Sequence, residues 1–219
     1  MKLDHIYVYG AGGHGKVVAD SLRAAGLPIA GFVDDAAARW DRPVLDLPVV
    51  ASGWLCAHRD LQPTRIALGI GDNRARQTVA ERCRSWGLEL VRVIHPAATI
   101  SPSARIGPGT VILAGAVINA DAQLGLGVIV NTGAVVEHDC ILGDYAHLSS
   151  NATLGGAARV GALAHVGLGA VVLPGGAVGA QTVIGAGAVV VHSIPAGVVA
   201  FGVPARVRAP VGKEVSSCP

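Results

Sequence analysis

Residues 136–172 read VEHDCILGDYAHLSSNATLGGAARVGALAHVGLGAVV, and this stretch decides the fold. An isoleucine, leucine or valine returns at every sixth position, and the spacing continues on both sides without an exception. The full series is Ile94, Ile100, Ile106, Ile112, Ile118, Leu124, Val130, Val136, Leu142, Leu148, Leu154, Val160, Val166, Val172, Val178, Ile184 and Val190. Seventeen successive matches are too many for chance, so the segment is built from internal repeats.

A second position of the repeat, four residues after each aliphatic residue, is small or compact. It holds Ala98, Ala104, Thr110, Ala116, Ala122, Val128, Ala134, Cys140, Ala146, Ala152, Ala158, Ala164 and Ala170. Glycine often follows the aliphatic residue, as at Gly143 and Gly161, and it suits a turn or a close backbone approach. Each hexad therefore predicts one short strand with its corner, and stacked hexads would bury a continuous aliphatic column that includes Cys140.

The composition excludes several classes of protein. Lysine and arginine number 17 against 15 aspartate and glutamate residues, with no basic run, so nucleic acid is not an expected partner. The cysteines Cys56, Cys83, Cys140 and Cys218 form no C-x-x-C pair, which argues against a disulfide framework and a zinc knuckle. A reducing compartment is expected.

The first fifteen residues bear on the location of the protein, and residues 160–205 bear on its assembly. The first fifteen residues resemble no signal peptide, so a cytoplasmic protein is expected. Residues 160–205 contain no aspartate, glutamate, lysine or arginine, but glycines, Pro174, Pro195 and the period of six argue against a membrane span. Uncharged outer faces of this length would leave apolar surface in water, which predicts a homotrimer.

The first ninety residues follow another pattern, in which short strands alternate with helices. Residues 5–9, 29–33, 66–70 and 88–94 are predicted strands, and residues 16–25 and 73–86 are predicted helices, the second with Asp72 as its N-cap. This order predicts an α/β domain of Rossmann type.

A glycine loop joins the first predicted strand to the first predicted helix. Its pattern is Gly10-x-Gly12-x-x-Gly15, and the acidic pair Asp34 and Asp35 follows about twenty residues later. Backbone N–H groups at a helix start can hold a diphosphate, and a carboxylate can accept from a ribose hydroxyl or a base N–H. The loop therefore predicts a nucleotide site, with a tight turn that binds nothing as the alternative.

His138 is the candidate general base. It stands between Glu137 and Asp139, and an imidazole beside carboxylates gains basicity and a fixed tautomer. The alternative is a solvated surface histidine in a polar corner.

The repeat has the form [LIV]-G-x-x-A-x and resembles the bacterial hexapeptide acyltransferases over residues 94–192. The motif order is more specific: Y-G-A-G-G-H-G, V-D-D, G-I-G-D-N, I-H-P-A-A-x-I-S-P-S-A and N-T-G-A-V-V-E-H-D-C. Residues 5–208 thereby resemble the sialic acid O-acetyltransferase (NeuD) family. Within it they are most similar to enzymes that N-acetylate UDP- or GDP-linked 4-amino-4,6-dideoxy sugars of the bacillosamine and perosamine type.

The resemblance implies a left-handed parallel β-helix with three hexads per turn, trimers, and acetyl-coenzyme A bound between neighbouring prisms. Residues 18 apart would then stack, which places His147 over His165. Such a stack is open to a metal site of the γ-class carbonic anhydrase kind, although no metal is expected because no further ligand recurs at that spacing.

The resemblance also assigns roles to particular residues. It implies that His138 is the proton acceptor and that Asp139 raises its basicity. The implied contacts to the nucleotide-linked sugar are Gly12, Gly13, His14, Asp34, Asp35 and Gly71. The implied lining of the coenzyme A groove is His147, Gly156, Leu168 and Ala186, with Ala186 standing where the family often has glycine.

The sequence thus predicts a Rossmann-like nucleotide-sugar domain, 1–93, and a left-handed β-helix acetyltransferase domain with a C-terminal tail, 94–219. The predicted activity is acetyl-coenzyme A dependent N-acetylation of the 4-amino group of a nucleotide-linked amino sugar, by direct transfer. Three alternatives stay open: O-acetylation of a sialic acid, a γ-type metalloenzyme, and a scaffold that binds nucleotide sugars without catalysis.

Overall fold

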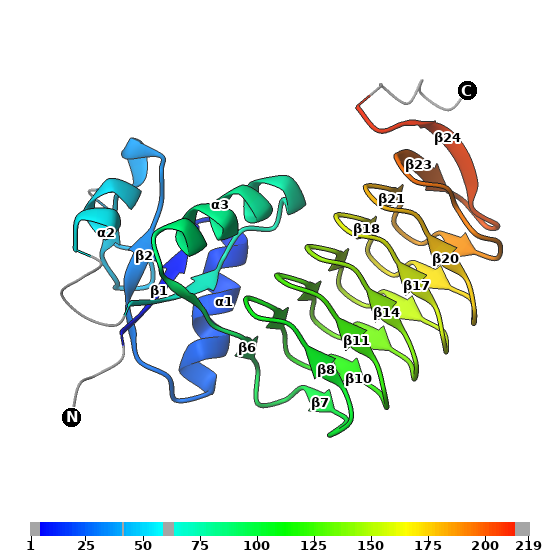
Figure 1. Ribbon diagram of the computed structural model, residues 1–219, viewed down its shortest axis with the longest axis horizontal. Coiled ribbons are helices and arrows are strands. Elements are labelled where there is room, and N and C mark those ends of the chain that lie inside the picture. Colours follow the sequence, from blue (N-terminus) through cyan, green and yellow to red (C-terminus); the bar gives the residue numbers. More distant parts are fainter. Residues whose placement is uncertain (1–4, 41, 59–63, 213–219) are drawn as a thin grey trace.

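The computed structural model describes residues 5–40, 42–58 and 64–212, which form an α/β unit followed by a long β-helix (Figure 1). Cys218 and the outer ends of the predicted domains 1–93 and 94–219 lie outside these ranges. None of the helices in these ranges is long and apolar enough to cross a membrane.

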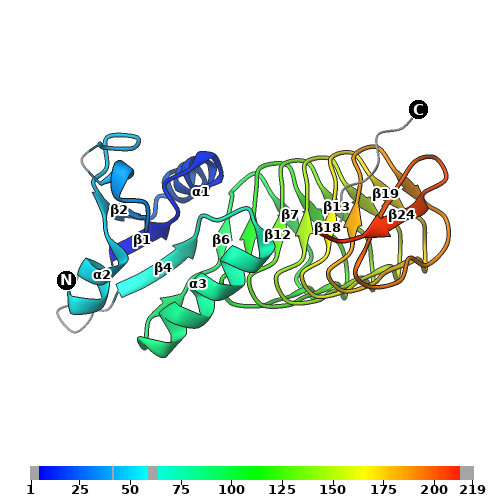
Figure 2. The same ribbon diagram turned by 90° about the horizontal axis from the view of Figure 1, so that it is seen from above.

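The α/β unit is built on one parallel sheet with the strand order β3-β2-β1-β4-β5. Its strands are β1 (His5–Tyr9), β2 (Ile29–Val33), β3 (Val49–Val50), β4 (Thr64–Leu68) and β5 (Glu89–Leu90). Its helices are α1 (Gly13–Ala24), η1 (Ala37–Arg39), α2 (Ser52–His58) and α3 (Asn73–Ser85). Val8 packs in the core beneath α1 and Tyr9 in the core beneath α3, so helices cover both faces of the sheet (Figure 2).

Several boundaries differ from the sequence prediction. Helix α1 begins at Gly13 rather than at residue 16, because the last glycines of the loop already belong to its first turn. The predicted strand 66–70 becomes β4, two residues earlier, and β3 and α2 were missed because they are too short to show a period. Asp72 caps α3 as predicted, since its side chain accepts a hydrogen bond from Ala75 N at 2.8 Å.

The predicted strand 88–94 divides between the two architectures. β5 completes the α/β sheet, whereas β6 (Val93–Ile94) opens the β-helix and pairs with β9. The chain therefore changes architecture between β5 and β6, at Val91 and Arg92.

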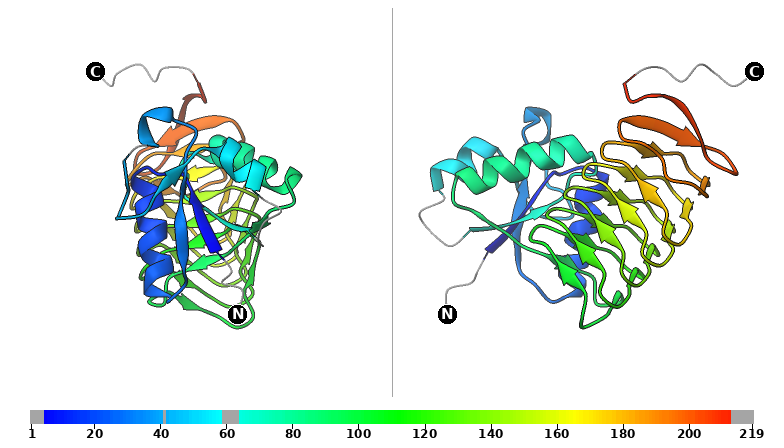
Figure 3. Two further views of the ribbon diagram at one scale, coloured as in Figure 1. Left: turned by 90° about the vertical axis from the view of Figure 1, so that its left-hand side faces the viewer. Right: turned by 45° about the vertical axis from the view of Figure 1, so that its right-hand side comes forward.

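The remainder winds into a left-handed parallel β-helix, which confirms the predicted fold. The two-residue strands after β6 are β7 (Thr99–Ile100), β8 (Arg105–Ile106), β9 (Val111–Ile112), β10 (Val117–Ile118), β11 (Gln123–Leu124), β12 (Ile129–Val130), β13 (Val135–Val136), β14 (Ile141–Leu142), β15 (His147–Leu148), β16 (Thr153–Leu154), β17 (Arg159–Val160), β18 (His165–Val166), β19 (Val171–Val172), β20 (Ala177–Val178), β21 (Val183–Ile184) and β22 (Val189–Val190). Together with β6 they stack into three sheets of eight, six and five strands, the first of which also includes the hairpin β23 (Val198–Phe201) and β24 (Arg206–Pro210) (Figure 3).

The side chains at both repeated positions of the hexad point into the interior of the β-helix. Aliphatic residues such as Val136 and Val172 and small residues such as Ala134 and Ala152 are fully buried in one continuous cluster. Cys140 lies in the same column, and its thiol donates to the Gly155 carbonyl at 3.2 Å, so its prediction as a core residue is confirmed.

The α/β unit and the β-helix share their cores. Val93, Val111 and Ile129, all from the eight-stranded sheet, pack in one cluster with Val18 and Leu22 of α1. Apolar contacts of this kind resist sliding because protein cores are close-packed. The α/β unit is therefore seated on the eight-stranded sheet of its own β-helix.

Candidate active site

His138 and Asp139 lie at a corner of the β-helix, between the six-stranded and the five-stranded sheets. His138 Nδ1 is 2.7 Å from Asp139 Oδ2, and this hydrogen bond is the main reason that the pKa of His138 is raised. The imidazole is 62% exposed, so a bound molecule can reach it and give up a proton to its free nitrogen, Nε2. Glu137, the other flanking carboxylate, accepts instead from Asn119 Nδ2 at 2.9 Å.

Gly156 clears the space that this imidazole occupies. It lies at the same corner one coil later, and a Cβ built on it would be 2.6 Å from His138 Nε2. Real Cβ atoms do not approach that closely, so any other residue at this position would displace the ring. The structure therefore places Gly156 directly against His138, in addition to its predicted contact with coenzyme A.

We expect Gly156→Ala to lower kcat about 10-fold, because small displacements of a catalytic group are costly. The denaturation midpoint should stay unchanged, since the exposed His138 ring can move aside without cost to the core. Steady-state kinetics and thermal unfolding measure the two effects. Gly53→Ala, on α2, where an added Cβ would meet nothing within 4 Å, serves as the control, and equal kcat for the two variants would contradict the assigned role of Gly156.

The glycine loop divides into two kinds of position. Gly10 and Gly15 are required by the fold: a Cβ on Gly10 would lie 2.6 Å from Gly69 O, and one on Gly15 would overlap Gly10 O. A Cβ added to Gly12 or Gly13 would meet nothing within 4 Å, although both residues open helix α1, whose N-terminus has no side-chain cap and no acidic residue in its first turn. The free backbone N–H groups at this helix start, and the open space beside Gly12 and Gly13, suit an anionic ligand.

The acidic pair after β2 is split in its roles. Asp34 Oδ2 accepts from Ala11 N and Asp34 Oδ1 from Ala36 N, both at 2.9 Å, so this carboxylate holds the loop in place. Asp35 is more exposed and pairs with Arg82 at 2.5 Å. Of the two predicted substrate contacts, Asp35 has the more accessible carboxylate.

Three histidines line the seam between the α/β unit and the eight-stranded sheet. His147 and His165 stack as predicted, with ring centroids 4.7 Å apart, and His14 lies 6.3 Å from His147. Burial lowers the pKa of His14 to about 4 and that of His147 to about 3, so both rings are neutral near pH 7. His14 Nε2 and His147 Nδ1 are buried without a hydrogen-bond partner among the described residues, as expected where a ligand binds.

Arg76 is a residue of this seam that the sequence analysis missed. Its side chain is fully buried, and Nη1 donates to the carbonyls of Ile70 and Gly71 at 3.1 and 3.0 Å. Nε donates to Gly127 O at 2.8 Å and Nη2 to Tyr145 O at 2.7 Å, both in the β-helix. Arg76 therefore fixes the loop that contains the predicted contact Gly71 to the β-helix.

Asn73 extends this network. Its Oδ1 accepts from Arg76 Nη2 at 2.8 Å, and its Nδ2 donates to Leu163 O and Ala164 O at 3.0 and 3.1 Å. Helical spacing could have revealed both residues. Arg76 shares its face of α3 with the buried Val79, Ala80 and Cys83 at i+3, i+4 and i+7.

Comparison with known proteins gives the family of this chain. Residues 5–83 match the family described as the PglD N-terminal domain. A histidine variant of perosamine N-acetyltransferase from Caulobacter crescentus, in complex with CoA and GDP-perosamine, is 45% identical with a TM-score of 0.91, covering 94% of this chain and 98% of that one. The chain belongs to the nucleotide-linked amino-sugar N-acetyltransferase family. The predicted family is confirmed.

Two further relatives agree. The acetyltransferase domain of PglB from Neisseria gonorrhoeae FA1090, in complex with acetyl coenzyme A, is 40% identical with a TM-score of 0.86, covering 94% of this chain and 100% of that one. UDP-N-acetylbacillosamine N-acetyltransferase from Bacillus subtilis (strain 168) is 41% identical over 115 residues, 51% of this chain and 52% of that protein. The matched segment thus spans about half of that curated relative.

The predicted coenzyme A residues do not come together within one chain. Gly156 lies beside His138, whereas Leu168 and Ala186 are exposed at another corner, between the eight-stranded and the six-stranded sheets. His147 lies on the eight-stranded sheet against His14. If all four line one groove, as predicted for this family, a neighbouring chain must supply part of it.

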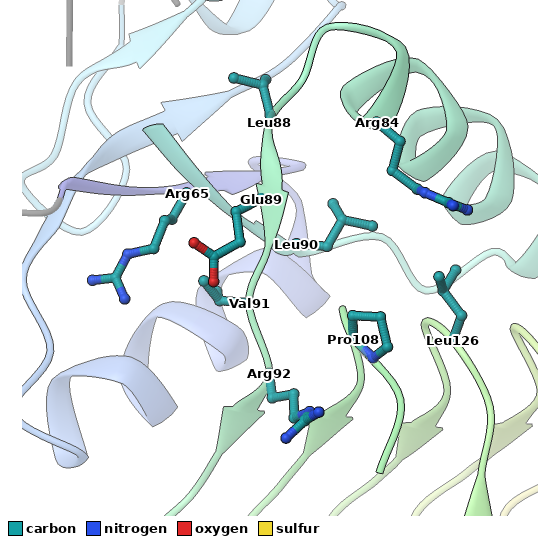
Figure 4. A pocket seen from close by; sticks show the side chains of 9 residues that line it. All are labelled: Arg65, Arg84, Leu88, Glu89, Leu90, Val91, Arg92, Pro108 and Leu126. Atoms are coloured by element: carbon teal, nitrogen blue, oxygen red, sulfur yellow. The ribbon is translucent and has the colours of Figure 1, made fainter. Parts of the chain in front are cut away.

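Two cavities lie near the junction of the two units. One of about 370 Å³ is lined by Gly71, His147 and His165, and thus borders the predicted substrate site. The other, of about 630 Å³, lies along the edge strand β5, and the guanidinium groups of Arg65, Arg84 and Arg92 around it point apart (Figure 4). It contains no predicted site residue. Within the described ranges, no group of three or more metal-ligand side chains could hold an ion.

Proposed function

We propose that this chain transfers the acetyl group of acetyl-coenzyme A to the 4-amino group of a UDP- or GDP-linked amino-deoxy sugar. The observation that carries this is the exposed His138–Asp139 pair, with Gly156 leaving room for its ring. An open glycine loop at the start of α1 supplies a diphosphate cradle on the same chain. Solved relatives that bind CoA with GDP-perosamine, or acetyl coenzyme A, support both halves of the proposal.

The proposed reaction is direct transfer. His138 Nε2 takes a proton from the sugar ammonium, and the neutral amine attacks the thioester carbonyl. Backbone N–H groups stabilise the oxyanion, after which the C–S bond breaks. The second proton leaves the acylated nitrogen for the coenzyme A sulfur, which departs as a thiol, and His138 returns the first proton to solvent. Cys140, which follows the His138–Asp139 pair in the chain, is not the nucleophile in this scheme, because it is buried in the core and burial raises the pKa of its thiol.

A single chain does not complete this site. The cradle is seated on the eight-stranded sheet, where His14 contacts His147, while His138 lies at the corner between the other two sheets. The β-helix itself therefore stands between the nucleotide site and the base of the same chain. We infer that the functional form is a homotrimer in which one chain supplies His138 and a neighbour supplies the cradle.

Hybrid trimers test this arrangement. His138→Ala removes the base, and Gly13→Val fills the cradle with a side chain at a position where an added Cβ meets no other part of the fold. Each variant alone should be inactive. Co-expression should restore about one quarter of wild-type activity, because random mixing of the two variants leaves about one quarter of the sites with both an intact His138 and an intact cradle. Absence of recovery in verified hybrids, or a monomer by light scattering at micromolar concentration, would contradict the shared site.

We expect Asp35→Ala to weaken binding of the nucleotide-linked sugar about 10-fold, since its carboxylate would lose a hydrogen bond to the nucleoside. Acetyl-coenzyme A should bind as before, because Asp35 lies in the α/β unit. Isothermal titration calorimetry with UDP, GDP and coenzyme A measures this. Asp20→Ala, an exposed carboxylate on α1, is the control, and equal nucleotide affinity in the two variants would remove Asp35 from the site.

An assay of acetyl transfer across UDP- and GDP-linked amino sugars and free sialic acid tests the function as a whole. The diphosphate cradle favours the nucleotide-linked substrates, because free sialic acid has no diphosphate.

The γ-type metalloenzyme is the less favoured alternative, because the rings of His147 and His165 are stacked, 24° from parallel, and do not point at one shared ion. Acetyl-coenzyme A and nucleotide sugars are cytoplasmic metabolites, so we place the enzyme in the cytoplasm.

A further inference from the structure

Arg39 is held at the edge of the glycine loop. It ends the short helix η1 after the acidic pair, and its Nη1 donates to Ala11 O at 2.8 Å. Ala11 stands between the two glycines that open the loop, and its own N–H is held by Asp34. Asp34 and Arg39 thus hold the backbone of Ala11 through its N–H and its carbonyl, and the guanidinium lies next to the open positions Gly12 and Gly13.

Most of the donors of this guanidinium remain available. The Arg39 side chain is 47% exposed, and Nη2 has no acceptor within the described part of the chain. Nε faces Asp34 Oδ2 at 3.6 Å, but both oxygens of that carboxylate already accept from backbone N–H groups. A planar group with five N–H donors, anchored through one of them, is suited to bind a phosphate with the others.

We propose that Arg39 is a phosphate-binding residue of the nucleotide-sugar site, where it contacts the diphosphate together with the backbone at Gly12 and Gly13. The inference rests on the proposed function and adds to it the cation that offsets the charge of the substrate. Two further observations mark the site as one that receives a ligand. A Cβ at either glycine would meet nothing, and the buried His14 Nε2 has no partner among the described residues.

The expected effect is specific to the phosphates. Arg39→Gln should weaken binding of UDP or GDP, whichever the wild type binds, about 10- to 100-fold, the range for a charge-assisted hydrogen bond. Uridine or guanosine, followed by NMR titration, should keep its Kd because it has no phosphate. Arg39→Lys should lie between, since it keeps the charge and loses the planar donor pair.

The difference between nucleoside and nucleoside diphosphate binding separates a phosphate-binding role of Arg39 from a purely structural one. If Arg39 only shaped the loop through Ala11, nucleoside and nucleoside diphosphate would weaken by the same factor, and the proposal would be overturned. Unchanged affinity for the diphosphate would also overturn it. Arg42→Gln, an exposed arginine three residues along, is the matched control and should bind like the wild type. A wild type that binds neither UDP nor GDP would instead contradict the proposed function, and the role of Arg39 with it.

Discussion

His138→Ala should lower kcat about 10²- to 10⁴-fold while the Kd for coenzyme A stays unchanged, because the imidazole acts in the chemical step rather than in binding. The structure supports this split, since the ring makes its one side-chain hydrogen bond to Asp139. Steady-state kinetics together with calorimetry on coenzyme A measures the two quantities. Unchanged kcat near pH 7 would remove His138 from the mechanism and leave proximity as the source of the rate.

The pH dependence gives a second test of the same residue. A base works when it is unprotonated, so kcat/KM should rise with pH through the pKa of His138, which its bond to Asp139 raises. Asp139→Asn removes the carboxylate that raises the pKa of His138, so the midpoint of the pH profile should move to lower pH and the maximal rate should fall. His192→Ala, at an exposed histidine between β22 and β23, is the control and should leave the profile unchanged. A midpoint that stays in place in Asp139→Asn would contradict the pairing.

The fold could be predicted from the sequence because each hexad is a local unit whose inward positions repeat. Val136, Leu154 and Val172 stack on successive coils and are buried for the same reason, namely that one period sets all of them. The dyad could also be predicted, since His138 and Asp139 are adjacent in the chain. A coil of 18 residues likewise placed His147 over His165.

The seam between the two units could not be predicted in the same way. Arg76 finds its acceptors at Gly127 and Tyr145, 51 and 69 residues away, and no local pattern reports such distances. The acidic pair shows the same limit. Asp34 and Asp35 look equivalent in the sequence, yet one holds the loop and the other pairs with Arg82, because neighbouring side chains at a strand end point to opposite sides.

Arg76→Met should lower the free energy of unfolding by about 3–5 kcal/mol, the cost of breaking a buried charged network by removing one partner. The substitution would leave four backbone carbonyls and the Asn73 amide oxygen without their shared donor. Denaturant unfolding at a fixed chain concentration measures this, because assembly makes stability depend on concentration. Arg74→Met is the control: Arg74 is exposed on the same helix and should cost less than about 1 kcal/mol.

A second readout separates the charge of Arg76 from its hydrogen bonds. Arg76 adds to the burial that lowers the pKa values of His14, His147 and His165, so its removal should raise all three toward the usual range. Arg76→Lys keeps a positive charge but lacks the planar fork, so it should destabilise the protein while shifting these pKa values less than Arg76→Met does. NMR titration of the histidines measures the shifts. Equal pKa values in both variants and the wild type would show that burial alone keeps the histidines neutral, and equal stability of Arg76→Met and Arg74→Met would show that Arg76 does not hold the two units together.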